Sequence, residues 1–279
     1  MSSAPSSGHE LRIANARMYS VTPEVEALWR SLLARVTHAA GVELTYFPYP
    51  IPQPLELLWA RPDLGAVLMC GYPIAMRLAP VVPLAAPIPA ASWAAGQPVY
   101  RTDLVVRTDA PYRTLEDTFG GRAGWTVNHS HSGFNAWRHH LLAFRSAERP
   151  RLYAEMHGDL VGTRSILQAV LEGSIDVGPL DAYWHQLLAR YAPQRTAGVR
   201  VLATTAVAPM PAFVAAAGTP PQVTGRLRDA FTSAAGERWF EPFAEGLMLR
   251  GFAAVTPATY EVLLDREREA LAAGYPLPA

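Results

Sequence analysis

Two successive blocks of alternating strand and helix patterns constrain the fold of this 279-residue chain more than any other feature. The first block predicts strand, helix, strand, helix and strand, in that order, over residues 11–16, 23–40, 42–47, 54–60 and 66–70. Its long helix has Thr22 as the expected N-cap, Pro23 as the first helical residue and Gly41 at its end. Such alternation is typical of mostly parallel sheets with helices on both faces.

The second block repeats the alternation after two further strand patterns at 81–88 and 99–107. Its helices are expected at residues 114–119, 133–145, 163–171 and 181–190. Its strands are expected at residues 123–127, 151–155, 175–178 and 199–204. The tail adds a strand pattern at 212–216 and helices at 220–235 and 257–271, which do not make a third sheet.

Together the blocks predict an α/β fold of two lobes, each a mixed sheet flanked by helices. The tail is expected to return to the first lobe, so the chain crosses between lobes twice, within 99–105 and 202–210, and forms a double hinge. Lobe 1 then comprises residues 1–100 and 206–279, and lobe 2 comprises residues 101–205. A cleft between such lobes collects strand ends and helix N-termini, where ligands bind.

The basic residues of the chain narrow its chemistry, because all 24 of them are arginine and none is lysine. The absence of lysine excludes a Schiff base with pyridoxal phosphate and a Walker-type phosphate loop. The 24 acidic residues bring the formal net charge to zero, which argues against nucleic acid or an anionic membrane surface as the partner. A GC-rich genome is a sufficient explanation of the bias, so it excludes functions without choosing one.

Neither the start of the chain nor its longest apolar stretch predicts a membrane segment. The start, Met1–Glu10, lacks the basic and apolar regions of a signal peptide. The longest uncharged apolar stretch, Leu78–Ala95, contains four prolines and is not expected to span a membrane. We therefore expect a periplasmic protein if a leader was removed, and a cytoplasmic one if the chain is complete as given.

The segment Asn128–Gly133 is the strongest local signal for a binding site, because it joins a predicted strand to a predicted helix. Hydroxyl groups of Ser130 and Ser132, together with backbone N–H groups and the helix dipole, can bind an anion at such a position. An ordinary serine N-cap is the alternative interpretation.

Other polar residues follow predicted strands and are candidates for the same cleft. His157 follows a strand of the second block, and Asp181 begins a helix there, where it can cap the helix or face a ligand. Tyr19 and Tyr72 follow strands of the first block and can reach a polar ligand through their hydroxyl groups. The alternative for each of these residues is a structural role, in which its polar group is hydrogen-bonded within the fold.

Metal binding and covalent catalysis have weaker support in the sequence. His129, His131, His139 and His140 are close in the chain, but no acid or cysteine completes a ligand set. The single cysteine, Cys70, lacks an evident base to activate its thiol. We predict no metal site and no cofactor.

Several spaced motifs resemble the phosphate/phosphite/phosphonate family of ABC-transporter solute-binding proteins. Residues 99–117 resemble the family's crossing strand and its "SP…SLEDL" helix, and residues 130–134 are similar to its "S-T-S-G-Y" oxyanion loop. A third segment resembles the family's "GSH…S…AV..G..D…ID" pattern, through His157, Ser165, Val170, Gly173, Asp176 and Leu180–Asp181.

The resemblance implies a type 2 periplasmic-binding-protein fold that closes on a small anionic ligand and delivers it to an ABC permease. It implies that Ser130, His131 and Ser132 bind the oxyanion group and that His157 contributes to the same pocket. By the same resemblance, Asp181 faces the ligand, and Tyr19 and Tyr72 line the cleft. His131 replaces the family's middle threonine, which favours a carboxylate, a sulfonate or a larger phosphorylated ligand.

Two other functions remain open at this point. A cytoplasmic enzyme on the same fold, similar to chorismate dehydratase-like enzymes, could use His157, His131 and Asp181 as acid and base. Thiamine pyrimidine synthases on this fold need a lysine-bound cofactor and are excluded. A ligand-sensing module is the third possibility, although no DNA-reading helix-turn-helix pattern is present.

Overall fold

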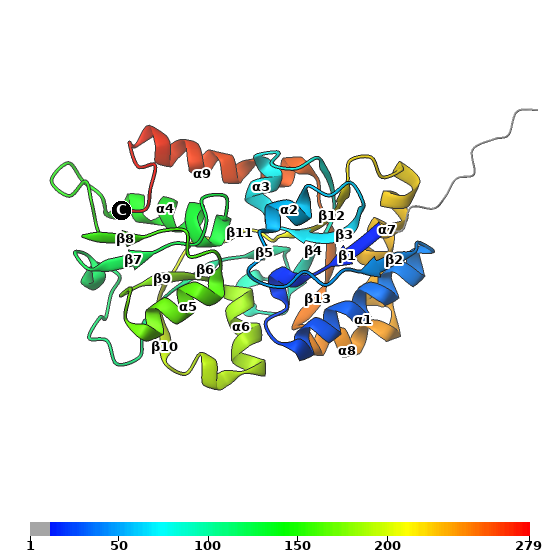
Figure 1. The fold of residues 1–279 in the computed structure, drawn as a ribbon, viewed down its shortest axis with the longest axis horizontal. Helices are drawn as coiled ribbons and strands as arrows, with labels where there is room; N and C mark the ends of the chain where they lie inside the picture. The colour runs from blue at the N-terminus through cyan, green and yellow to red at the C-terminus, as the bar shows by residue number, and fades with distance from the viewer. Residues whose placement is uncertain (1–11) are drawn as a thin grey trace, which may run out of the picture.

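The computed structural model describes residues 12–279, so the N-terminal segment Met1–Glu10 lies outside the described residues. Two α/β lobes lie side by side, and the C-terminal helix runs along one side of both (Figure 1). The predicted α/β, two-lobed fold is confirmed.

Lobe 1 is built on a six-stranded mixed sheet in the order β13-β4-β12-β3-β1-β2. Its strands are β1 (Arg12–Asn15), β2 (Leu44–Tyr46), β3 (Leu64–Met69), β4 (Val81–Pro89), β12 (Ala212–Ala216) and β13 (Leu249–Ala254). Strand β1 is parallel to β2 and β3, whereas β12 is antiparallel to β3 and β4. The helices of this lobe are α1 (Pro23–Ala40), α2 (Leu55–Trp59), α3 (Gly71–Ala75), α7 (Pro221–Ser233) and α8 (Glu241–Gly246).

Lobe 2 is built on the antiparallel strands β10-β6-β9, which a parallel pair, β7 and β8, extends. Its strands are β6 (Thr102–Arg107), β7 (Arg122–Gly124), β8 (Glu155–His157), β9 (Gly178–Asp181) and β10 (Val199–Thr204). A bridge between Ala123 and Val177 joins the pair to the segment before β9. The helices of this lobe are α4 (Ala136–Leu141), α5 (Thr163–Glu172) and α6 (Ala182–Tyr191).

A short two-stranded ribbon connects the lobes, where β5 (Val99–Tyr100) pairs antiparallel with β11 (Ala208–Pro209). These strands lie within the two segments that the sequence predicts as crossings. The two crossings are therefore hydrogen-bonded to each other, which gives the connection the form of a double hinge.

Helix α1 shows how local sequence positions the elements around the cleft. The backbone N–H of Val25 donates to the Thr22 hydroxyl at 3.3 Å, and Gly41 ends the helix in the left-handed region at φ 57°. Val25, Trp29 and the other inward residues of this helix are buried. Its apolar face therefore packs into the core that lobe 1 shares with the inner helices of lobe 2.

The last helix, α9 (Glu261–Ala272), contacts both lobes. On the lobe 1 side, the Tyr72 hydroxyl donates to Glu267 Oε1 at 2.5 Å. On the lobe 2 side, His139 Nε2 lies 2.6 Å from Glu269 Oε2, and the Asn135 side chain donates to the Leu263 carbonyl at 2.8 Å. The chain end also joins lobe 2, because the Leu152 N–H donates to the Ala279 carbonyl at 3.1 Å.

Several local expectations differ from the structure. The sequence patterns predict neither strand β13 nor helices α3 and α8, and they predict a turn at Gly71–Pro73, where α3 begins. The strand expected at 175–178 lies later, as β9, because Val177 forms only an isolated bridge to Ala123. The helix expected at 114–119 is a single 3-10 turn, Glu116–Thr118. The strand expected at 151–155 lies at 155–157, because residues 151–154 form the loop that leads into β8. The helix expected at 133–145 starts as a π-helical turn at His131–Asn135 before α4 begins.

Among the described residues, no helix has the length and apolarity needed to cross a membrane.

Gly71, the first residue of α3, allows the close approach of the segment before α9, and its replacement should destabilise the protein. A Cβ atom at this position would lie 2.4 Å from Tyr260 Cδ1, and Tyr260 is fully buried. We expect Gly71→Ala to cost about 1–3 kcal/mol of unfolding free energy, measured by chemical denaturation. Gly225→Ala is the matched control, because the space around this α7 residue is open and alanine should stabilise the helix by roughly 0.5–1 kcal/mol. Equal effects of the two substitutions would contradict this packing.

Candidate functional site

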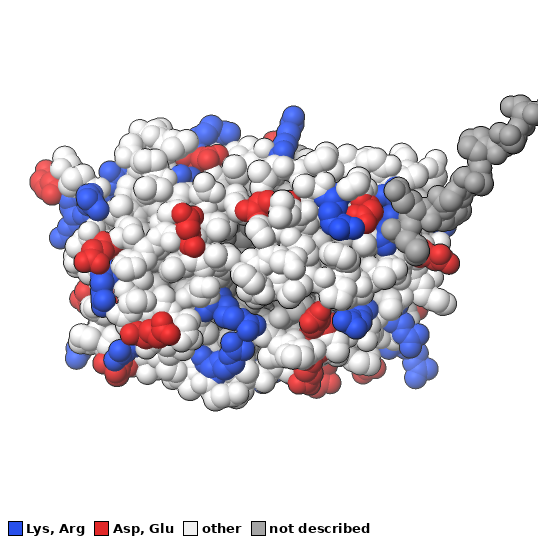
Figure 2. Space-filling view, in the orientation of Figure 1, with Lys and Arg blue, Asp and Glu red and all other residues white. Residues whose placement is uncertain are grey.

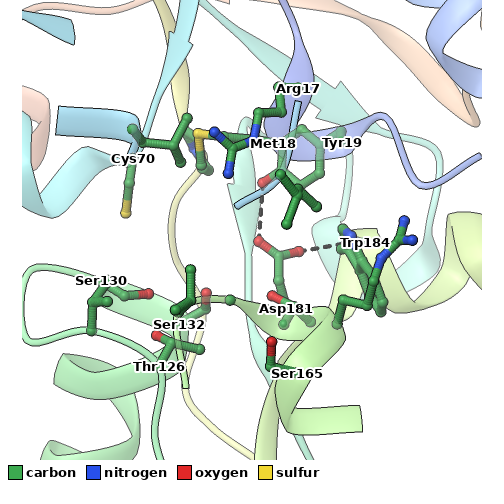
Figure 3. Close-up of a pocket in the computed structure, with 18 of the residues that line it drawn as sticks. Arg17, Met18, Tyr19, Cys70, Thr126, Ser130, Ser132, Ser165, Asp181 and Trp184 are labelled. Atoms are coloured by element: carbon green, nitrogen blue, oxygen red, sulfur yellow. Dashed lines mark hydrogen bonds between the residues drawn. The ribbon is translucent and has the colours of Figure 1, made fainter. Parts of the chain in front are cut away.

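A cavity of about 170 Å³ lies between the lobes, next to the hinge. Lobe 1 contributes Arg17, Tyr19, Trp59 and Cys70, and the hinge region contributes Tyr100 and Pro211. Lobe 2 contributes Thr126, Ser130, Ser132, Asp181 and Trp184 together with the first turn of α5. Figure 3 shows residues of both lobes facing each other across this space. One water needs roughly 10–15 Å³, so the cavity has room for a ligand of several heavy atoms.

The structure brings Tyr19, Ser130, Ser132 and Asp181 together in the lining of this cavity, as the sequence predicts. Tyr19 comes from the short 3-10 turn Arg17–Tyr19 after β1, and Asp181 is the last residue of β9. Both side chains are buried, and the Tyr19 hydroxyl donates a hydrogen bond to Asp181 Oδ2 at 3.0 Å. This hydrogen bond crosses from one lobe to the other (Figure 3).

Asp181 also caps the helix that follows it. Its Oδ1 atom accepts the backbone N–H groups of Tyr183 and Trp184, each at 3.0 Å. Burial raises the pKa of Asp181 to about 7, although the three hydrogen bonds that its carboxylate accepts act in the opposite direction. The capping role and the position in the cavity therefore coexist in one side chain, where the sequence treated them as alternatives.

The Ser130–Gly133 loop forms the lobe 2 side of the cavity. The Ser130 hydroxyl accepts the Gly133 N–H at 3.1 Å, which leaves the hydroxyl proton of Ser130 available to a ligand. The Ser132 carbonyl accepts a hydrogen bond from the Thr102 hydroxyl at 3.1 Å, which fixes the loop on β6. Gly133 permits this packing, because a Cβ atom there would lie 2.1 Å from Thr126 Oγ1.

His131 is buried beneath this loop and is not part of the cavity lining. Its Nε2 atom lies 3.2 Å from Arg266 Nη1 of α9, so this nitrogen accepts a hydrogen bond from the guanidinium. Burial and the positive charge of Arg266 lower the pKa of His131 well below its usual value, so the ring is neutral. Its backbone N–H donates to Sγ of Cys70, a residue of the cavity lining, at 3.5 Å.

Tyr72 and His157 are also outside the cavity lining. The Tyr72 hydroxyl is directed to Glu267 of α9. The imidazole of His157 is 40% exposed and lies 3.5 Å from Glu155 on the same strand. The first turn of α5, from Gly162 to Ser165, contributes to the lobe 2 side of the lining, whereas His157 does not.

Sequence reasoning missed two cationic residues of the site, Arg17 and Arg164. Arg17 precedes Tyr19 by two residues, and Arg164 lies in the first turn of α5, which begins at a glycine N-cap. A glycine N-cap leaves the first helical N–H groups without a side-chain acceptor, and this signal could have indicated the site.

The histidine-rich segment does not assemble a metal site. His129 Nε2 lies 3.1 Å from Glu56 Oε1 across the cleft, while His139 is bonded to Glu269 on α9. No cluster of three or more metal-ligating side chains occurs among residues 12–279.

A two-lobed α/β chain with a paired hinge and an interlobe cavity lined by hydroxyls and a helix N-terminus defines the class of solute-binding proteins with the type 2 fold. Residues 20–260 match the family described as "ABC transporter, phosphonate, periplasmic substrate-binding protein". The chain belongs to this family, which confirms the resemblance seen in its motifs. Its role is that of a solute-binding protein. A search of curated protein sequences found no match.

Solved structures show the same fold at low sequence identity. A binding protein component of an ABC phosphonate transporter from Pseudomonas aeruginosa is 15% identical, with a TM-score of 0.77 over 95% of this chain and 87% of that one. PhnD1 from Prochlorococcus marinus, solved in complex with methylphosphonate, is 14% identical, with a TM-score of 0.73 over 94% and 98% of the two chains. A Xanthomonas citri protein solved with bound ATP is 18% identical, with a TM-score of 0.62 over 95% and 98%.

The raised pKa of Asp181 predicts a specific dependence of stability on pH. Deprotonation of Asp181 costs more in the folded protein than in the unfolded chain, so stability is lost as the pH rises from about 4 toward 7. Asp181→Asn should keep the helix cap without this titration. The unfolding free energy of the variant, measured by urea denaturation, should rise relative to that of the original protein as the pH increases from 4 to 8. The total change should be a few kcal/mol, since each pKa unit corresponds to about 1.4 kcal/mol.

Asp176→Asn is the control with the opposite sign. Burial acts to raise the pKa of Asp176, but its hydrogen bonds from Arg122 lower it overall. The Asp176 variant should therefore be less stable than the original protein at neutral pH, and this gap should close as the pH falls. A pH-independent difference for Asp181→Asn would show that its carboxyl group does not titrate as described.

Proposed function

We propose that this protein binds an organic phosphonate or a related organic oxyanion between its lobes and delivers it to the permease of an ABC transporter. The observation that carries the proposal is the cavity in which Ser130, Ser132 and the N-terminus of α5 converge from lobe 2 and face lobe 1. Hydroxyl and backbone N–H donors of this kind recognise the oxygens of phosphonate, phosphate and carboxylate groups. Family membership and the relative solved with methylphosphonate support the same ligand chemistry.

Contacts across the cleft explain how ligand binding is coupled to closure. Besides the bond from Tyr19 to Asp181, the His129–Glu56 pair and a 3.2 Å hydrogen bond from Arg164 Nη2 to the Val21 carbonyl join the lobes. Each of these bonds joins an atom of lobe 1 to an atom of lobe 2, so separation of the lobes at the cleft would break them. A ligand that contacts both lobes adds to them and shifts the population toward closure.

We propose that binding occurs without catalysis. The enzyme alternative requires His131 and His157 beside the ligand, whereas both imidazoles lie outside the cavity lining. Cys70 does line the cavity, but burial raises the pKa of its thiol, which disfavours the nucleophilic thiolate. The hydroxyls and carboxyl group of the site are suited to holding an anion.

The location and the lobe boundaries belong to the same proposal. Delivery to an ABC permease implies a periplasmic protein. Lobe 1 is proposed to comprise residues 1–100 and 206–279, with residues 101–205 as lobe 2. The division at 206 is supported by the return of β12 and β13 to the first sheet. Tyr275, however, packs in the core of lobe 2, so the last residues of the chain join the second lobe.

Isothermal titration against a panel of phosphonates, phosphate monoesters, sulfonates and carboxylates tests this function. We expect saturable binding of at least one phosphonate or phosphate monoester, and Ser132→Ala should weaken it by about tenfold through loss of one hydrogen bond. Ser233→Ala is the control, since Ser233 lies on α7 away from the cavity and bonds only to its own helix. Chemical conversion of a panel member, or no binding of any phosphonate or phosphate monoester, would contradict the proposal.

A further inference from the structure

Two arginine side chains line the cavity from opposite lobes without a carboxylate partner. Arg17 comes from the turn after β1 in lobe 1, and Arg164 comes from the first turn of α5 in lobe 2. Within residues 12–279, neither guanidinium forms an ion pair with an acidic side chain. In a chain with equal numbers of basic and acidic residues, this local excess of positive charge is a specific feature of the cavity.

The contacts of Arg17 hold its guanidinium over the cavity. Arg17 Nη1 donates to the Gln53 carbonyl, and the guanidinium lies 5.3 Å from the ring centre of Tyr49. Figure 3 shows the Arg17 side chain pointing into the cavity, on the side opposite Ser130 and Ser132. A guanidinium has five N–H donors, so this arrangement leaves donors for a ligand.

Arg164 is held from the other lobe. Its Nη2 atom donates to the Val21 carbonyl at 3.2 Å, and its positive charge lies near that of Arg195. Figure 2 shows arginine atoms gathered over α5 and α6, just below the hollow between the lobes. The surface leading to the cavity is therefore positive on the lobe 2 side, which attracts an anion toward it.

Neither guanidinium is bonded to a neighbouring acid. The Asp181 carboxyl group is hydrogen-bonded to Tyr19 and the start of α6, and its pKa of about 7 leaves it partly protonated at neutral pH. The negative charge of Glu56 acts on Arg17, but its carboxylate lies 3.1 Å from His129 Nε2 and Glu56 is outside the cavity lining. Burial lowers the pKa of both Arg17 and Arg164, which shows that their charges are partly desolvated. An arginine remains protonated at neutral pH, so a bound anion would offset the free-energy cost of removing its charge from water.

Two buried hydroxyl groups in the lining also lack partners. Thr126 Oγ1 and the Tyr100 hydroxyl have no hydrogen bond among the described residues, although their side chains are only 2% and 1% exposed. Buried polar atoms are normally paired, so these two hydroxyls are unusual in the lining, although their oxygens have almost no accessible surface. They lie in the same cavity as the uncapped N-terminus of α5.

Much of the rest of the lining is apolar or aromatic. This part includes Met18, Leu55, Trp59, Val127, Trp184 and Pro211. A bare oxyanion such as phosphate would leave these side chains without contacts, whereas an organic substituent on the anion would bury apolar surface against them.

From these features we propose that the site selects a dianionic phosphonate that carries a bulky apolar or aromatic substituent, clamped between Arg17 of lobe 1 and Arg164 with the hydroxyls of lobe 2. This inference rests on the proposed function and adds the charge state and the substituent of the ligand. Arg17 and Arg164 are then the residues that determine specificity for two negative charges. Apolar contacts of the substituent determine which phosphonate is preferred.

Three probes of matched chemistry test the ligand class by titration calorimetry at neutral pH, where a large part of each phosphonate is dianionic and Asp181 is still partly protonated. Phenylphosphonate should bind about tenfold or more tightly than benzenesulfonate, which has the same ring and a single charge. It should also bind more tightly than methylphosphonate, which lacks the ring. A preference for methylphosphonate or for benzenesulfonate would overturn the inference and leave the proposed function intact. Failure of every phosphonate and every phosphate monoester to bind would instead contradict the proposed function itself.

Arginine variants test the clamp. Arg17→Gln and Arg164→Gln should each weaken phenylphosphonate binding by about 10- to 100-fold, and weaken benzenesulfonate binding less, because a hydrogen bond to a charged group is worth about 1.5–3 kcal/mol. Arg17→Lys should recover part of the affinity, since it restores the charge. Arg195→Gln is the matched control, because Arg195 lies near Arg164 but outside the cavity lining. Thermal unfolding verifies that each variant is folded, and unchanged affinity in a folded Arg17→Gln protein would overturn the proposal.

Discussion

The buried hydrogen bond between the Tyr19 hydroxyl and Asp181 joins the two lobes at the cavity, and much of the local structure depends on it. The bond requires β1 to deliver Tyr19 from one sheet and β9 to deliver Asp181 from the other, with the hinge ribbon in the paired state. The same carboxyl group caps α6, and Tyr183 of that helix donates to the Leu247 carbonyl of lobe 1. The contact between the lobes and the start of helix α6 therefore depend on the same carboxyl group.

The environment of this acid also explains why the two arginines of the cavity have no carboxylate partner. An ionised carboxylate would pair with the arginines and compete with an anionic ligand, but a buried acid whose pKa lies near 7 bears only part of a charge. The tyrosine hydroxyl and two backbone N–H groups already satisfy its oxygens. The guanidinium groups thus remain available to the ligand, as anion recognition without lysine requires.

The sequence predicted the architecture well, because strand and helix alternation and apolar periodicity are properties of local segments. It also placed Ser130, Ser132, Tyr19 and Asp181 in one cleft, because these residues follow strands whose ends meet. It could not show that His131 points away, since its position depends on Arg266, which is 135 residues distant in the chain and lies on α9. Arg17 and Arg164 were missed for a related reason: their role comes from the absence of acidic partners, which only the tertiary structure reveals.

Helix α9 has a mechanical consequence for how the protein exchanges its ligand. The helix is bonded to lobe 1 through Glu267 and to lobe 2 through Glu269 and the Leu263 carbonyl, and it therefore spans the boundary on one side of the molecule. Separation of the lobes on that side would break these bonds, whereas rotation about an axis near the helix would preserve them. An opening that preserves these bonds would keep the lobes together along α9 and expose the cavity on the opposite face of the molecule.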